Sequence, residues 1–93
     1  MTITRIHRFR AKSGMEEALH NLLLSAIPAI AEASDCLKVR LLSSLDDPAD
    51  FLIYEEWTSI EAHKAAAMNL SGDTISQIAS LVAETPRGDY YAG

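Results

Sequence analysis

The feature that most constrains this chain is an unbroken apolar run followed at once by two carboxylates and a tryptophan. The run is FLIY at residues 51–54, and Glu55, Glu56 and Trp57 follow it. A strand with one wet face alternates apolar and polar residues, whereas a continuous run indicates that both faces are covered. In a chain of 93 residues, one layer of helices can cover one face. We therefore expect a second copy of the chain to cover the other.

Two capping-box spacings predict where helices begin. Thr58 and Glu61 form the first, and Ser13 and Glu16 form the second. In such a box each side chain satisfies a free backbone N–H in the first turn of the helix. The first box predicts a helix over about 59–68. The second predicts a helix over about 15–30, in which Pro28 should cause a kink or weaken the last turn.

Hydrophobic periodicity predicts the other elements. Strands are expected at 2–11, 36–45, 51–57 and 89–91, and a further helix at 74–83. The first strand has no cleanly apolar face, so it should lie at an edge or line a cavity. The order βαββαβ predicts a ferredoxin-like α+β fold, with an antiparallel four-stranded sheet and helices on one face. Residues 1–93 are expected to be one domain, with Met15 and Met68 in its core.

Composition and charge exclude several classes of partner. The net charge is −5, and no run of lysine or arginine is present, which argues against nucleic acid and against an anionic membrane surface. Cys36 is the only cysteine, so no internal disulfide is possible. The longest apolar stretch, 22–31, is far shorter than the ~20 residues of a membrane helix. A cytoplasmic protein is expected.

No cofactor-binding motif is evident. His7, His20 and His63 are scattered, and none forms a pair with the spacing of a known metal site. Glycine-rich nucleotide motifs are absent from the sequence. The sequence therefore predicts neither a metal nor an organic cofactor.

The block CLKVRLLSSLDDPADFLIYEEWTSIEAHKAA, together with the strand end RFRAKSG, resembles the antibiotic biosynthesis monooxygenase family. This family is a branch of the dimeric α+β barrel proteins. The resemblance implies a homodimer in which two sheets form a barrel, and a pocket between each sheet and its own helices that binds a small aromatic ligand. In polyketide-oxidising members, an asparagine, a tryptophan and a tyrosine line that pocket. Here Ile53, Trp57 and His63 hold these slots. His7 aligns with an asparagine of haem-degrading members, and Ala66 with a frequent family histidine.

Six residues are candidates for the site. His63 can take a phenolic proton or hold the resulting anion, because histidine titrates near neutrality. Trp57 can stack on a flat aromatic ligand or donate its indole N–H. Substrate-binding roles are predicted for His7, Glu55, Ile53 and Phe9. A carboxylate at position 55 would need a partner in the pocket, for instance His7 or Arg5.

Three functions are compatible with these residues. The leading hypothesis is a cofactor-independent monooxygenase that oxidises a small electron-rich aromatic or quinol with O2, using His63 and Trp57 as catalytic residues. The second is a non-catalytic or ligand-sensing dimer, which the apolar residues Ile53 and Ala66 favour. The third is a haem-binding or haem-degrading protein, with His63 or His7 as the axial ligand.

Overall fold

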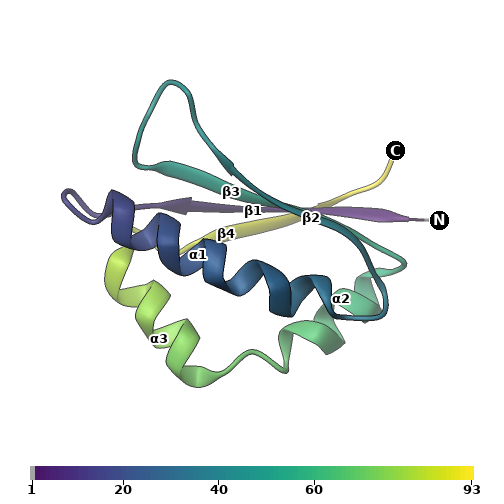
Figure 1. Cartoon of the computed structure of the whole chain (residues 1–93). Coiled ribbons are helices and arrows are strands. Elements are labelled where there is room, and N and C mark those ends of the chain that lie inside the picture. The colour runs from purple at the N-terminus through teal and green to yellow at the C-terminus, as the bar shows by residue number, and fades with distance from the viewer. Residues whose placement is uncertain (1) are drawn as a thin grey trace.

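The computed structural model describes residues 2–93, which form one antiparallel sheet with helices on a single face (Figure 1). The strands lie in the order β2-β3-β1-β4. This arrangement confirms the predicted ferredoxin-like α+β fold. The elements along the chain are β1 Ile3–Arg10, α1 Glu16–Ala31, β2 Cys36–Ser43, β3 Asp50–Trp57, α2 Ile60–Ala67, α3 Gly72–Leu81 and β4 Arg87–Tyr91.

The helices pack against only one of the two faces of the sheet, and the burial pattern of β3 shows this difference most clearly. Along β3, residues 51, 53, 55 and 57 are buried and face the helices, whereas 52, 54 and 56 are only partly buried and face away. The expectation of an edge position for β1 is wrong, since β1 pairs with both β3 and β4. The alternative expectation, that β1 lines a cavity, is met, because its helix-facing side borders the cavity described below.

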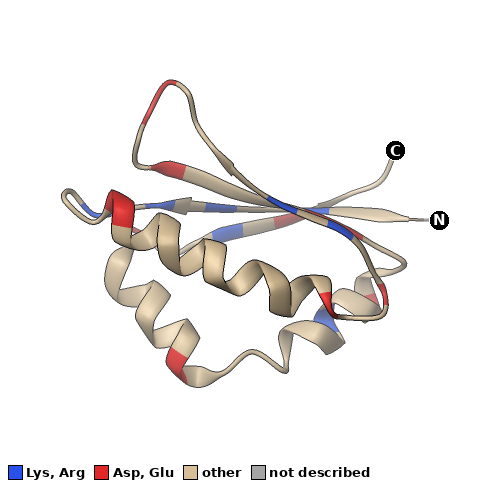
Figure 2. Cartoon of the chain, viewed as in Figure 1, with Lys and Arg blue, Asp and Glu red and all other residues tan. Residues whose placement is uncertain are grey.

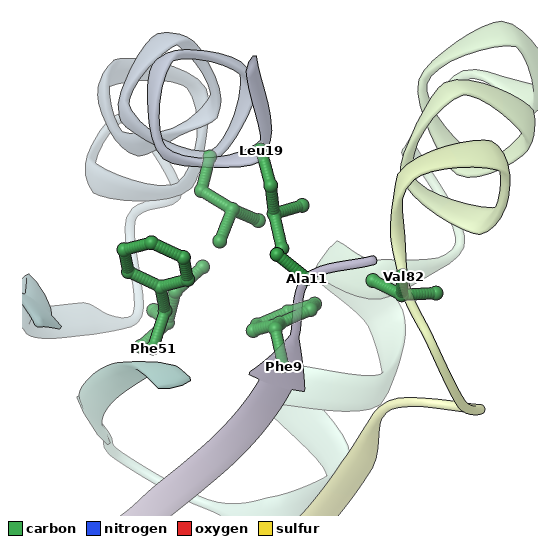
Figure 3. Packing of buried hydrophobic residues seen from close by; sticks show 7 residues of the cluster. Phe9, Ala11, Leu19, Phe51 and Val82 are labelled. Atoms are coloured by element: carbon green, nitrogen blue, oxygen red, sulfur yellow. The ribbon is translucent and has the colours of Figure 1, made fainter. Parts of the chain in front are cut away.

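The hydrophobic core lies between the sheet and α1, and Figure 3 shows its packing. Leu19 and Leu23, four residues apart on α1, are fully buried because this spacing places both on one helix face. Met15 and Met68 were expected in the core, but both are exposed, Met15 at the N-cap of α1 and Met68 at the C-cap of α2. The buried cluster comprises Phe9, Ala11, Leu19, Leu23, Phe51, Ile53 and Val82.

Helix α2 begins one residue later than its predicted capping box. Thr58 directly follows the end of β3, and its backbone N–H donates to the carbonyl of Asp35. Ser59 is the N-cap, and its hydroxyl accepts a hydrogen bond from the N–H of Ala62 at 3.1 Å. The predicted Thr58–Glu61 box is therefore wrong, although the helix itself is present.

Helix α1 differs from its predicted start and end. Ser13 does not cap it; Met15 occupies the N-cap without a side-chain bond. The predicted Ser13–Glu16 box is wrong, because the carboxylate of Glu16 accepts from the N–H of Gly14, at 3.0 and 3.1 Å, and not from that of Ser13. The positive φ of Gly14, 85°, is a conformation that suits glycine. Helical structure continues past Pro28 to Ala31, so the last turn is retained despite the missing N–H.

The outer strand β2 contains an irregularity that the strand pattern did not predict. Its register against β3 shifts between Cys36 and Lys38, which leaves Leu37 exposed as an extra residue. Val39 and Leu41, beyond the shift, lie opposite Glu55 and Ile53 and pack against the core. A bulge of this kind inserts one residue and increases the local twist. Within residues 2–93, every helix is too short or too polar to cross a membrane.

Candidate functional site

A cavity of about 820 Å³ lies between the sheet and the helices. Strands β1 and β3 supply its floor, and all three helices contribute to its walls. This volume lies within the range of sites for small organic molecules. Every residue that the sequence singled out as catalytic or substrate-binding lines it: Ile53, Glu55, Trp57, His63, His7 and Phe9.

The walls of the cavity are largely built from small and aliphatic side chains. Helix α1 carries its charges only in its first turn, so the part that borders the cavity is uncharged (Figure 2). Alanine side chains leave space between the helices and the sheet that larger residues would fill. The alanines that line the cavity are Ala26, Ala29, Ala33, Ala66, Ala67 and Ala79.

A buried carboxyl group and the indole form a pair in the lining of the cavity. The indole N–H of Trp57 donates to Oε1 of Glu55 at 2.8 Å. Glu55 is only 4% exposed, and this burial raises the pKa of its carboxyl group. The expected partners, His7 and Arg5, form no hydrogen bond with it. Trp57 reaches it instead because residues two apart on a strand point to the same face.

His63 lies between the tryptophan and a tyrosine of the last strand. Its ring is edge-on to that of Trp57, with 5.4 Å between centroids. On its other side, Nδ1 lies 2.5 Å from the hydroxyl oxygen of Tyr90, and the imidazole tautomer decides which atom donates. Burial, and then the charges of Arg5 and Lys64, lower the pKa of His63. The imidazole is therefore neutral at pH 7 and can accept a proton.

Tyr90 is the site residue that sequence reasoning missed. It lies 27 residues after His63, and only the pairing of β4 with β1 brings the two together. The tyrosine slot that the family resemblance implies falls on His63 itself. The one available signal was a tyrosine in a short final strand after the last helix.

His7 and Arg5 occupy neighbouring positions on the helix-facing side of β1. The ring of His7 packs against Phe9 with 4.4 Å between centroids. Burial lowers the pKa of His7 to about 4, with smaller contributions from the charges of Arg5 and His63. The guanidinium carbon of Arg5 lies 4.8 Å from the centroid of the Tyr90 ring. The polar groups that line the cavity thus include two neutral imidazoles, one guanidinium and the buried carboxyl group of Glu55.

Comparison with known proteins now identifies the family. The sequence pattern of the antibiotic biosynthesis monooxygenase family matches residues 2–68. The chain belongs to this family. A search of curated proteins finds no match to it.

Several solved structures share its fold over most of their length. Rv0793 from Mycobacterium tuberculosis has a TM-score of 0.86 at 20% identity, covering 100% of this chain and 95% of that one. SO0527 from Shewanella oneidensis has a TM-score of 0.82 at 26% identity, covering 97% and 88%. SnoaB from Streptomyces nogalater, described as a cofactor-independent oxygenase, has a TM-score of 0.80 at 15% identity, covering 99% and 92%. The family member described here therefore has the fold of these proteins.

Proposed function

We propose that this protein is a cofactor-independent monooxygenase that oxidises a small electron-rich aromatic, such as a quinol or an anthrone, with O2. The observation that supports this most directly is the neutral His63, held between Trp57 and Tyr90 on the wall of a largely apolar cavity. Membership of the family supports it further. So does the likeness in fold to SnoaB, a cofactor-independent oxygenase.

In this proposal His63 removes a proton from the bound substrate. For Nε2 to accept that proton, Nδ1 must carry the ring hydrogen and donate it to the hydroxyl oxygen of Tyr90. Tyr90 is then a positioning residue that selects the tautomer, as second partners of histidine commonly do. Trp57 packs against the aromatic ring of the substrate, while its N–H remains bound to Glu55.

The deprotonated substrate then reduces O2 itself. For an anthrone, the CH2 carbon loses two hydrogens and gains one atom of O2 as a carbonyl oxygen. The second oxygen atom leaves as water and carries both hydrogens. Apolar walls favour this chemistry because they exclude bulk water, which would otherwise protonate the carbanion.

Oxygen consumption by the purified protein tests this proposal. With a panel of quinols and anthrones, we expect uptake above the buffer rate, and His63→Ala should lower it by about 10²-fold or more, the usual contribution of a general base. His20→Ala is the matched control, because His20 lies on α1 and does not line the cavity. No uptake with any substrate, or equal uptake by His63→Ala, would contradict the proposal.

The pH profile supplies a second readout of the same step. Because the pKa of His63 lies below the ordinary value of 6.5, the base stays neutral as the pH falls past that value. The acid limb of kcat/KM should therefore fall below pH 6.5. A limb above that pH would rule out His63 as the base.

A ligand-binding protein without turnover is the second candidate function. Ile53 and Ala66 line the cavity at slots that are often polar in the family, and neither side chain can form a hydrogen bond. Thermal stabilisation by small aromatics without oxygen uptake would favour this function. A Soret band after haem addition would instead support haem binding through His63 or His7.

We also propose that the chain forms a homodimer through the sheet face that the helices leave open. Cross-strand neighbours on this face include two apolar pairs, Leu42 with Leu52 and Ile6 with Tyr54. A second copy would cover these side chains and so complete the barrel.

A further inference from the structure

Arg5 is the one arginine or lysine that lines the cavity within the described part of the chain. Its cross-strand neighbours are Glu55 on β3 and Tyr90 on β4. The charge of Arg5 favours the carboxylate form of Glu55, but no salt bridge joins the two, and Oε1 of Glu55 accepts the indole N–H of Trp57. The guanidinium lies over the ring of Tyr90, and residues 2–93 offer it no ion pair.

One atom of this guanidinium is left without a partner. Nε of Arg5 is buried and forms no hydrogen bond in residues 2–93. Buried polar groups are nearly always hydrogen-bonded, so each exception calls for an explanation. Nε itself is closed to solvent, so a ligand in the cavity would meet the other guanidinium nitrogens, and an acceptor there would offset the charge.

Gly88 makes this position of Arg5 possible. A Cβ at residue 88 would overlap Nη2 and Cζ of Arg5, so the guanidinium occupies the space that the missing side chain leaves. The face of Tyr90 holds it from the same strand. The guanidinium is therefore packed in a defined place before any ligand arrives.

The surrounding charges define the ligand more closely. Three carboxyl groups line the cavity, those of the exposed Glu32 and Glu84 and of the buried Glu55, and negative charge on them disfavours a second negative charge on the ligand. The planar guanidinium matches a carboxylate, whose two oxygens can accept parallel hydrogen bonds. The aliphatic walls suit an aromatic body.

We propose that the cavity binds an aromatic monocarboxylate, with its carboxylate paired to Arg5 and its ring system lying between the sheet and the alanine-lined helices. This inference rests on the proposed function, because it specifies the substrate class of the same cavity. Arg5 serves as the residue that selects the anion, and Gly88 serves as the residue that positions Arg5.

Isothermal titration with a matched pair of probes tests the inference directly. 2-Naphthoate and 2-naphthamide have the same shape, but only the first is an anion. At pH 7 we expect the naphthoate to bind about tenfold more tightly, because charge-assisted hydrogen bonds exceed neutral ones and each 1.4 kcal/mol is tenfold. Arg5→Gln should bring the two affinities together. Gly88→Ala should do the same, since it displaces the guanidinium without changing its charge.

Controls keep the result interpretable even if a variant fails to fold. Arg10→Gln is the matched arginine variant, because Arg10 pairs with Asp47 at the far end of β1 and does not line the cavity. It should retain the preference for naphthoate. Equal binding of the two probes to the unmodified protein would overturn the inference without any variant. Tighter binding of 2-naphthylmethylammonium than of naphthoate would do so as well.

These outcomes are separate from those of the oxygenase proposal. Oxygen uptake with a neutral anthrone, combined with equal binding of the two naphthalene probes, would remove the anion inference alone. A clear preference for naphthoate without any oxygen uptake would remove the oxygenase alone, and would leave an anion-binding protein.

Discussion

At the scale of single residues, His7 links the chemistry of the cavity to the stability of the fold. Its imidazole is packed against Phe9 and faces the charge of Arg5. Both burial and that charge disfavour the protonated form. The pKa of His7 is about 4 in the folded chain, whereas an ordinary histidine has a pKa of 6.5.

The unfolded chain therefore binds more protons than the folded chain between pH 6.5 and 4. Stability should fall as the pH drops through this window, by up to about 3 kcal/mol from His7 alone. Urea unfolding at pH 7 and pH 4.5 measures the loss, and His7→Gln should lose less than the unmodified protein over the same interval. An equal loss in both proteins would show that other groups dominate acid unfolding.

The residues of the site differ in how far the sequence could predict them. Trp57, Glu55 and Ile53 share one face of β3 by simple alternation, so their common orientation followed from spacing. The hydrogen bond from Trp57 to Glu55 could not be predicted, because the sequence positions do not show which nearby donor the carboxylate will accept from. Tyr90 could not be predicted, since its contact with His63 depends on which strands pair.

At the scale of elements, the short helix α2 holds His63 in place and depends on its first turn. Its cap is the hydroxyl of Ser59, which accepts from the N–H of Ala62. Both Thr58 and Ser59 fit the capping preference, so the sequence could not choose between them. The backbone fold makes Ser59 the N-cap, because the N–H of Thr58 is bound to the carbonyl of Asp35.

Two alanine variants distinguish the observed cap from the predicted one. Ser59→Ala should destabilise the protein by about 1 kcal/mol, the usual effect of losing an N-cap. Thr58→Ala is the neighbouring control and should change stability far less, because its side chain caps nothing. Thermal or urea unfolding compares the two. A larger loss in Thr58→Ala would restore the predicted capping box.

At the scale of the whole molecule, the helices cover one face of the sheet and leave the other open (Figure 1). The continuous apolar run at 51–54 predicted two covered faces, and one chain supplies only one cover. The sequence of one chain indicates that the second face of the sheet is covered, but it does not show what covers it.

Leu52→Asp tests whether a second copy covers the open face. A carboxylate beside Leu42 on that face should oppose burial in a dimer, so the variant should sediment as a monomer while the unmodified protein sediments at twice the chain mass. Met68→Asp, on the exposed end of α2, is the matched control and should remain dimeric. A stable monomer of the unmodified protein at micromolar concentration would contradict the dimer.

The alanines that line the cavity have a consequence for how such a protein can change over evolution. One nucleotide substitution turns an alanine codon into a valine codon. At Ala26, Ala66 or Ala79 this change would reduce the volume of the cavity that is open to a ligand. The sheet and the buried cluster beneath it would be left as they are. Relatives with this architecture can thus diverge in the size of compound they accept through point changes in the helices, while their shared scaffold persists.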